Sequence, residues 1–217
     1  MKRRQIVDRT ASYVREMSEN ESTGHDWWHT FRVWNTAKYI AKKEHADLFT
    51  VELAALLHDV ADWKFHDGDE TVGAKIARRW LRKMKLEEDV IDRVCYIIVN
   101  VSFKGAMHKN SIKSIEGMVV QDADRLDSTG AMGIARCFAF GGYAGRPIYD
   151  PKVKPTIKKT VKEYKRVKGS STSINHFYEK MLLLKDRMNT KTGKKMAKSR
   201  HIFMKNYLKE FFREWKC

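Results

Sequence analysis

The sequence predicts an all-α protein organised as a single domain. Its 217 residues include only three prolines and are rich in Ala, Leu, Lys, Glu and Met, which favour helices over sheets. Apolar residues recur with a helical period along most of the chain. A hydrophobic content of 42% over this length is sufficient for one sizeable core, or for a core with a small appendage.

Five helices are predicted in the first half of the chain, over about residues 2–17, 25–45, 47–60, 71–84 and 87–103. In the third, Thr50 is the expected N-cap and Glu52 lies in the first turn. In the second, the apolar residues at helical spacing are Trp28, Phe31, Val33, Trp34, Ala37 and Ile40. We assign the cluster of Trp27, Trp28 and Trp34 to the core, with stacking of one ring on a base as the alternative.

The second half contains an acidic cluster, a proline-bearing linker and two more helices. Residues 115–142 are largely apolar but are interrupted by "DADRLD". Pro147, Pro151 and Pro155 mark 146–170 as a loop or linker. Helices are predicted over 173–188 and 194–215, with these residues in phase: Phe177, Met181, Leu184 and Met188, then Met204, Leu208, Phe211 and Trp215. We expect one domain over 1–217, with a core at about 20–145 and C-terminal helices from 171–217 packed on it.

The excess positive charge lies almost entirely in the last third of the chain. The formal net charge is +16, and residues 151–217 alone hold 20 Lys and Arg against 5 Asp and Glu, a net of +15. We attribute most of this charge to solvated helix faces. Binding of nucleic acid or of small polyanions is the alternative interpretation, although RNA-recognition and zinc-finger patterns are missing from the sequence.

The sequence favours a cytoplasmic protein. The longest apolar run is far shorter than the ~20 residues of a membrane span. The basic start becomes amphipathic rather than continuously apolar, unlike a secretory signal. Cys95, Cys137 and Cys217 are scattered and odd in number, which fits neither a zinc site nor a disulfide framework.

Two histidine-containing segments carry side chains suited to metal binding. In "ALLHDVADWKF", His58 and Asp59 end an apolar run and lie about 100° apart on a helix, so both can reach one point near its end. In the preceding predicted helix, His25 and His29 are four residues apart and share a face, and Arg32 follows one turn after His29.

A third segment, "QDADRLD", places several carboxylates within an apolar helix. Asp122 and Asp124 are two residues apart and point to nearly opposite sides, whereas Asp124 and Asp127 can share a face. A buried carboxylate without a partner costs several kcal/mol, so a cation or an arginine such as Arg125 is expected beside them.

Two imidazoles and two carboxylates from three helices make a mixed nitrogen and oxygen site. Such a site suits Mn²⁺, Fe²⁺, Co²⁺ or Zn²⁺ better than Mg²⁺. Four protein ligands leave coordination positions for water, whose pKa is lowered there, and this favours hydrolysis of phosphoesters or phosphoanhydrides. The alternative is that His29 and His58 are ordinary core histidines and that "DADRLD" is an internal ion-pair cluster around Arg125.

The chain also resembles a known family. "GHDWWHTFRV", "LLHDVADWKF" and "DADRLDSTGAMGIAR" resemble the signature blocks of the HD-domain metal-dependent phosphohydrolases, which share the ligand pattern H…HD…D on an all-α scaffold. "NVSFKG", "GGYAGRPIYD", "INHFYEKMLLLKDRMNT" and "REW" resemble the bacterial YpgQ-type branch, whose members include nucleoside triphosphate pyrophosphohydrolases. These blocks span roughly residues 20 to 215 and imply a single-domain HD-type helical bundle.

The resemblance implies which residues bind the metal ion. His29 is the first ligand, His58 and Asp59 form the doublet, and Asp124 of "ADRL" is the closing aspartate, with Asp122 ranked well below it. Mn²⁺ is the expected ion, with Co²⁺, Fe²⁺, Ni²⁺, Zn²⁺ and Mg²⁺ as alternatives. Asp59 is expected both to bind the ion and to position the nucleophile.

Other residues are candidates for substrate contact or for acid/base catalysis. Arg32 and Lys64 are expected to contact phosphates, with a surface ion pair and a solvated lysine as the respective alternatives. His25 is expected to orient a ligand or to contact substrate, whereas Asp26 is explained by its position at a helix start. Asp69 or Glu70 is the candidate acid/base carboxylate, with Glu70 the one we assign, and an ordinary turn with an N-cap in "DGDE" is the alternative.

We therefore expect hydrolysis of a (deoxy)nucleoside triphosphate to the monophosphate and pyrophosphate. Alternatives on the same metal site are a nucleoside monophosphate phosphatase and a cyclic-nucleotide phosphodiesterase. An alternative of another class is a protein that binds nucleic acid or a signalling nucleotide through the basic C-terminal region. The expected partner is a phosphorylated small molecule rather than a membrane, with nucleic acid less favoured.

Overall fold

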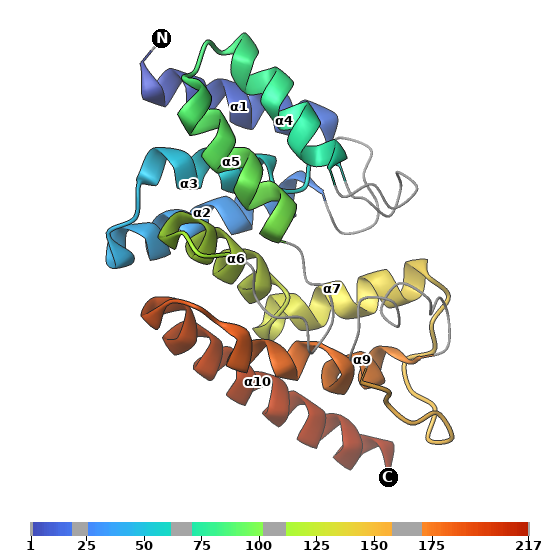
Figure 1. Ribbon diagram of the computed structural model, residues 1–217. Helices are drawn as coiled ribbons and strands as arrows, with labels where there is room; N and C mark the ends of the chain where they lie inside the picture. The colour runs from blue at the N-terminus through green and yellow to red at the C-terminus, as the bar shows by residue number, and fades with distance from the viewer. Residues whose placement is uncertain (1, 19–25, 62–70, 102–111, 158–170, 217) are drawn as a thin grey trace. The chain divides into compact units, whose positions relative to one another are not determined.

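The structure is a computed structural model that describes residues 2–18, 26–61, 71–101, 112–157 and 171–216 (Figure 1). In these ranges every regular element is helical and no strand occurs, so the predicted all-α fold class is confirmed. The chain forms two compact units that divide between Asp124 and Arg125. This division does not coincide with the proline-bearing segment, and the predicted domain limits stay a prediction.

The first unit contains six helices among its described residues: α1 (Arg3–Met17), α2 (Trp27–Glu44), α3 (Leu48–Leu57), α4 (Val72–Lys83), α5 (Glu88–Val101) and most of α6 (Ile115–Asp127). Helix α3 packs against α1, α2 and α5 and lies between them (Figure 1). All its residues from Phe49 to Leu57 are buried. A helix that is apolar all round must be enclosed on every side, so α3 forms the centre of this unit.

The start of α3 corrects one sequence prediction. The N-cap is Asp47 and not Thr50, because the Asp47 carboxylate accepts a hydrogen bond from the Thr50 backbone N–H at 3.2 Å. The Thr50 hydroxyl donates to the same carboxylate at 2.5 Å. Desolvation raises the pKa of Asp47, but the hydrogen bonds from Thr50 outweigh it and the pKa falls below its ordinary value. Asp47 therefore caps the helix as a carboxylate.

The predicted core face of α2 is only partly correct. Val33, Trp34, Ala37 and Ile40 are buried as expected. Trp28 is 58% exposed and Phe31 is 38% exposed, and their rings contact each other edge to face at the surface. An apolar pattern does not specify how much of a helix is covered, and here Trp28 and Phe31 lie on the part of α2 that stays exposed.

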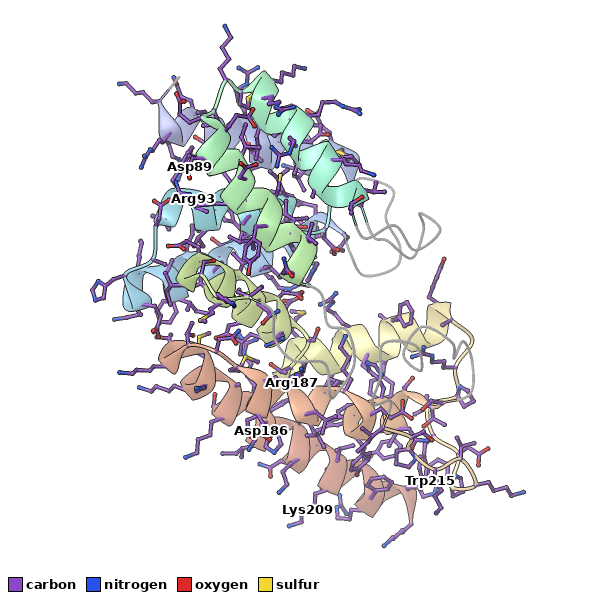
Figure 2. The ribbon with its side chains drawn as sticks, in the orientation of Figure 1. Asp89, Arg93, Asp186, Arg187, Lys209 and Trp215 are labelled. Carbon is purple, nitrogen blue, oxygen red and sulfur yellow. The ribbon has the colours of Figure 1, made fainter. Side chains whose placement is uncertain are left out.

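The surface of the first unit is held by ion pairs on α4 and α5. Arg78 pairs with Asp92 at 2.6 Å, and Arg82 pairs with Glu88 at 2.7 Å. Asp89 and Arg93 form a pair at 3.0 Å on the exposed side of α5 (Figure 2). Because these groups are solvated, their pairing contributes little to stability, and the core carries most of it.

The second unit contains α7 (Gly130–Tyr143), α9 (Ser173–Glu179), the 3₁₀ helix η2 (Met181–Arg187) and α10 (Lys191–Trp215). Its core is formed by the buried residues Ile134, Ile174, Phe177, Met181, Met204 and Leu208. Two sequence predictions need correction here. The helix predicted over 173–188 is interrupted at Lys180, whose φ of −141° leaves the helical region, and Trp215 is 52% exposed at the end of α10.

The largely apolar segment 115–142 also separates into two helices. Helix α6 ends at Asp127, and α7 begins at Gly130 with a φ of +68°, a left-handed conformation that glycine adopts without strain. Within the ranges that the structure describes, none of the helices combines the length and the hydropathy needed to cross a membrane.

Candidate metal centre

The first turn of α2 positions His29. The carboxylate of Asp26, the N-cap, accepts a hydrogen bond from the His29 backbone N–H at 2.8 Å. This bond fixes the start of the helix, and the His29 side chain is 1% exposed. Asp26 thus has the helix-start role that its sequence position indicated, and it holds the backbone of a candidate ligand.

The end of α3 positions His58. This residue is the C-cap of the buried helix, and it is 7% exposed. Its Nδ1 atom lies 2.8 Å from the carbonyl oxygen of Ala55, three residues earlier. A carbonyl oxygen can only accept, so Nδ1 carries a proton, and in the neutral ring Nε2 is the nitrogen with the free lone pair. His58 Nε2 is buried and has no hydrogen-bond partner among the described residues.

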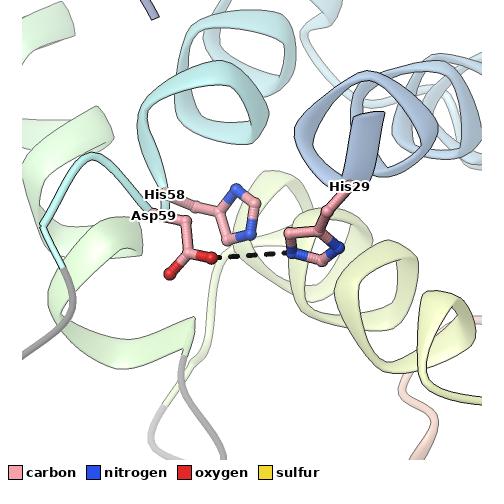
Figure 3. Close-up of side chains that lie close together, drawn as sticks. All are labelled: His29, His58 and Asp59. Atoms are coloured by element: carbon pink, nitrogen blue, oxygen red, sulfur yellow. Dashed lines mark ion pairs between the residues drawn. The ribbon is translucent and has the colours of Figure 1, made fainter. Parts of the chain in front are cut away.

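Asp59 brings a carboxylate to the same place (Figure 3). Its Oδ2 atom lies 3.6 Å from His29 Nε2, and the two imidazole rings are 5.3 Å apart between centroids. His29, His58 and Asp59 each offer one ligand atom, and these atoms all lie within 4.8 Å of one another. Helices α2 and α3 therefore bring together three of the four predicted ligands.

Asp124 on α6 approaches both histidines. Its Oδ1 atom lies 3.7 Å from His29 Nε2 and 3.9 Å from His58 Nε2, and its side chain is 26% exposed. Asp122, in contrast, is fully buried. Asp127 lies in the second unit, where Arg136 donates to its Oδ2 atom at 2.8 Å. The carboxylate of Asp124 thus lies close to both candidate histidine ligands.

The residues present fit a divalent ion. Separations of 3.6 to 3.9 Å are too long for hydrogen bonds between these groups. They suit atoms that share one ion, since two ligands each about 2.1 Å from a metal lie roughly 3–4 Å apart. The buried Nε2 atom of His58 is the strongest indication, because an unsatisfied buried polar atom is costly unless a ligand binds it.

A buried glutamine on α6 supports Asp124, and the sequence reasoning missed it. Gln121 is 1% exposed, and its Nε2 atom donates to the carbonyl oxygens of Asn100 and Val101, both at 3.2 Å. These carbonyls lie at the end of α5, so Gln121 fixes α6 one turn before Asp124. An amide within an apolar helix close to a metal motif was the signal that pointed to such a role.

Of the residues predicted to contact substrate or to act in acid/base catalysis, the structure describes Arg32. Arg32 is half-buried on α2, one turn after His29, and its contact with phosphate stays a prediction. His25, Lys64 and Glu70 lie outside the described residues, so their predicted roles also stay open. Arg125 and Arg136 lie in the second unit, where Arg125 donates to the carbonyl oxygen of Arg187.

Comparisons with known proteins agree with this geometry. The HD domain model matches residues 27–129. YpgQ of Bacillus subtilis is 38% identical over 214 residues, covering 97% of this chain and 94% of YpgQ. The crystal structure of B. subtilis YpgQ in complex with ADP has a TM-score of 0.78 and 36% identity, and covers 99% of this chain and 97% of that one. An HD-superfamily hydrolase from Bacillus thuringiensis has a TM-score of 0.77 and 39% identity, and covers 99% of both chains.

The helical fold and the paired histidines with their neighbouring carboxylate define a metal-dependent hydrolase of the HD superfamily. Within this class, the chain belongs to the family of B. subtilis YpgQ, because the similarity extends over nearly the full length of both proteins. The resemblance noted from the sequence motifs is therefore confirmed.

Proposed function

We propose that this protein hydrolyses (deoxy)nucleoside triphosphates to the monophosphate and pyrophosphate, with Mn²⁺ as the expected ion. The observation that carries the proposal is the convergence of His29 Nε2, Asp59 and the buried Nε2 atom of His58. Support for a nucleotide substrate comes from YpgQ, which was solved in complex with ADP.

The proposed ligands are His29, His58, Asp59 and Asp124. A divalent ion held by these residues would lower the pKa of coordinated water and polarise a phosphate oxygen. Mixed imidazole and carboxylate ligands favour Mn²⁺ or a similar transition metal over Mg²⁺. The hydrogen bond from His58 Nδ1 to the Ala55 carbonyl keeps the lone pair of Nε2 directed to the ion.

The chain's own residues have distinct parts in the proposed reaction. The carboxylate of Asp59 accepts a hydrogen bond from the attacking water and thereby orients it. The guanidinium of Arg32, one turn from His29, neutralises the triphosphate, as does Lys64. Glu70 takes up or supplies a proton as the acid/base group. Attack of water on the α-phosphorus breaks the bond to the bridging oxygen, and pyrophosphate leaves.

Product analysis in labelled water tests this function. The protein is incubated with Mn²⁺ and a panel of NTPs, dNTPs and monophosphates in H₂¹⁸O. We expect pyrophosphate as the product from triphosphates, with ¹⁸O in the monophosphate, and no reaction in EDTA. Orthophosphate released from monophosphates would instead indicate a phosphatase, and absence of turnover with every nucleotide would contradict the proposal.

A further inference from the structure

A basic cavity lies on the first unit, away from the metal centre. It has a volume of about 550 Å³ and is enclosed by the start of α1, Phe49 on α3, the turn between α4 and α5, and the first turn of α5. None of the four candidate metal ligands lines it. A cavity of this size is within the range of about 300–1,000 Å³ that small-molecule sites occupy.

The charges around this cavity are strongly unbalanced. Arg3, Arg9, Lys83 and Lys85 line it, against a single acidic residue, Glu87. Four cations that share one concave surface repel one another, so an anion bound among them is stabilised. The walls between the charges are apolar: Ile6 and Met84 are each 4% exposed, and the Arg3 guanidinium lies 5.0 Å from the centre of the Phe49 ring.

A second cavity adjoins the first and has different walls. It lies between α1 and α4, has a volume of about 830 Å³, and shares Arg9 and Lys83 with the basic cavity. Two of its lining residues, Tyr13 and Trp80, stack with an interplanar angle of 5°. Trp80 is fixed further by a hydrogen bond from its Nε1 atom to the Thr10 hydroxyl at 3.0 Å. The second cavity thus has a rigid aromatic wall.

The two cavities differ in the charge of the residues that line them. Lys83 stands where they meet, with its Nζ atom 5.8 Å from the centre of the Trp80 ring. Asp8 and Glu16 line the second cavity together with Arg9, Arg79 and Lys83, so its charges nearly balance, whereas four cations against one carboxylate make the first cavity strongly positive. A ligand that spans both cavities would therefore have its anionic end in the first cavity and a flat, less charged end in the second.

We propose that these two cavities form a nucleotide-binding site separate from the metal centre. The phosphates bind among Arg3, Arg9, Lys83 and Lys85, and the base packs against Tyr13 and Trp80. Because no metal ligand lies in the site, bound nucleotide is not hydrolysed there. The site therefore serves as an accessory site that responds to a nucleotide, whatever the substrate of the metal centre is.

The test measures binding of ADP to the full chain in EDTA by isothermal titration calorimetry. The variant is Lys83→Glu with Lys85→Glu, and the matched control is Lys42→Glu with Lys43→Glu, which makes the same charge change in the exposed last turn of α2. We expect ADP affinity to fall at least about tenfold in the variant and to stay within about twofold in the control. EDTA removes the contribution of an ion at the metal centre, and both double variants keep that centre's residues.

Two further measurements complete the test. Adenosine and pyrophosphate are each expected to bind the wild-type protein at least about tenfold more weakly than ADP, since each occupies one cavity only. Should the charge-reversed variant fail to fold, Lys83→Gln with Lys85→Gln is used, with an expected loss of about threefold. Equal ADP affinity in variant and control, pyrophosphate binding as tight as ADP binding, or no ADP binding to the wild type would each overturn the proposal.

Discussion

The Nδ1 atom of His58 lies 2.8 Å from the carbonyl oxygen of Ala55, within the same turn of chain that closes α3. This contact fixes the tautomer of a buried imidazole, because the carbonyl requires a proton on Nδ1. The lone pair of Nε2 is consequently available on the side where His29 and Asp59 lie. One local hydrogen bond would thus orient His58 for its proposed role as a metal ligand.

Asp59→Ala is expected to abolish metal binding and hydrolysis together. Removal of this carboxylate deprives the cluster of one of its three closely spaced ligand atoms. We expect bound Mn²⁺ and turnover to fall by about 100-fold or more. Metal content by mass spectrometry and product release by chromatography measure the two effects. Asp89→Ala, on the exposed side of α5, is the control and should change neither (Figure 2). Turnover that survives in Asp59→Ala would remove this residue from the mechanism.

Gln121→Leu is expected to weaken metal binding without removing a ligand. The substitution leaves the buried carbonyls of Asn100 and Val101 without the amide that now donates to them. This should cost about 1–3 kcal/mol of unfolding free energy. Because Asp124 lies one turn further along α6, we also expect Mn²⁺ affinity to drop about tenfold. Urea unfolding and calorimetric titration with Mn²⁺ give the two values. A loss of stability with unchanged affinity would assign Gln121 a purely structural role.

Gly133→Ala is expected to destabilise the protein, whereas Gly142→Ala is not. A methyl group at Gly133 would lie 2.4 Å from the backbone carbonyl carbon of Ser128, which cannot move aside cheaply. We expect a loss of about 1–3 kcal/mol. At Gly142, on the same helix, nothing lies within 4 Å, so alanine should stabilise by up to about 1 kcal/mol. Thermal unfolding of both variants beside the wild type makes the comparison, and similar effects at the two sites would refute it.

Cys137 is expected to make stability depend on alkaline pH. Burial raises the pKa of its thiol from an ordinary value of 9.0 to about 11. Below pH 9 the thiol is protonated in both folded and unfolded chains. Between pH 9 and 11 only the unfolded chain loses the proton, so stability falls as pH rises, by about 3 kcal/mol in total. Urea unfolding at pH 8, 9, 10 and 11 should show this decline to be smaller in Cys137→Ala. An equal decline in stability with pH for the wild type and Cys137→Ala would contradict the assignment of this effect to Cys137.

Most helices could be predicted from the sequence, since apolar periodicity repeats within each segment. The predicted bounds 2–17 and 71–84 differ from those of α1 and α4 by at most one residue at either end. Errors arose where local pattern and packing diverge. Trp28 has the spacing of a core residue but is exposed, and Thr50 has the chemistry of an N-cap although Asp47 holds that position. The exposure of Trp28 depends on tertiary packing and is not encoded in the local pattern. The N-cap, in contrast, is a local feature, because Asp47 lies three residues before Thr50 and aspartate is a preferred N-cap residue.

The candidate site was likewise only partly predictable from the sequence. Spacing indicated that His58 and Asp59 can reach one point, and the family resemblance added His29 and Asp124 to them. The buried glutamine that anchors α6, Gln121, was not recognised from the sequence, because its partners belong to another helix.

The sequence by itself determined the all-helical class and the residue types available for a metal site, since both follow from period and composition along the chain. Only the tertiary structure decided that His29, His58 and Asp59 meet within 4.8 Å, with a buried lone pair on His58 Nε2. The physical reason is that the convergence of these side chains depends on distances between atoms of separate helices. The tautomer of His58 depends on the carbonyl oxygen that its Nδ1 atom faces. Such distances are set when the helices pack.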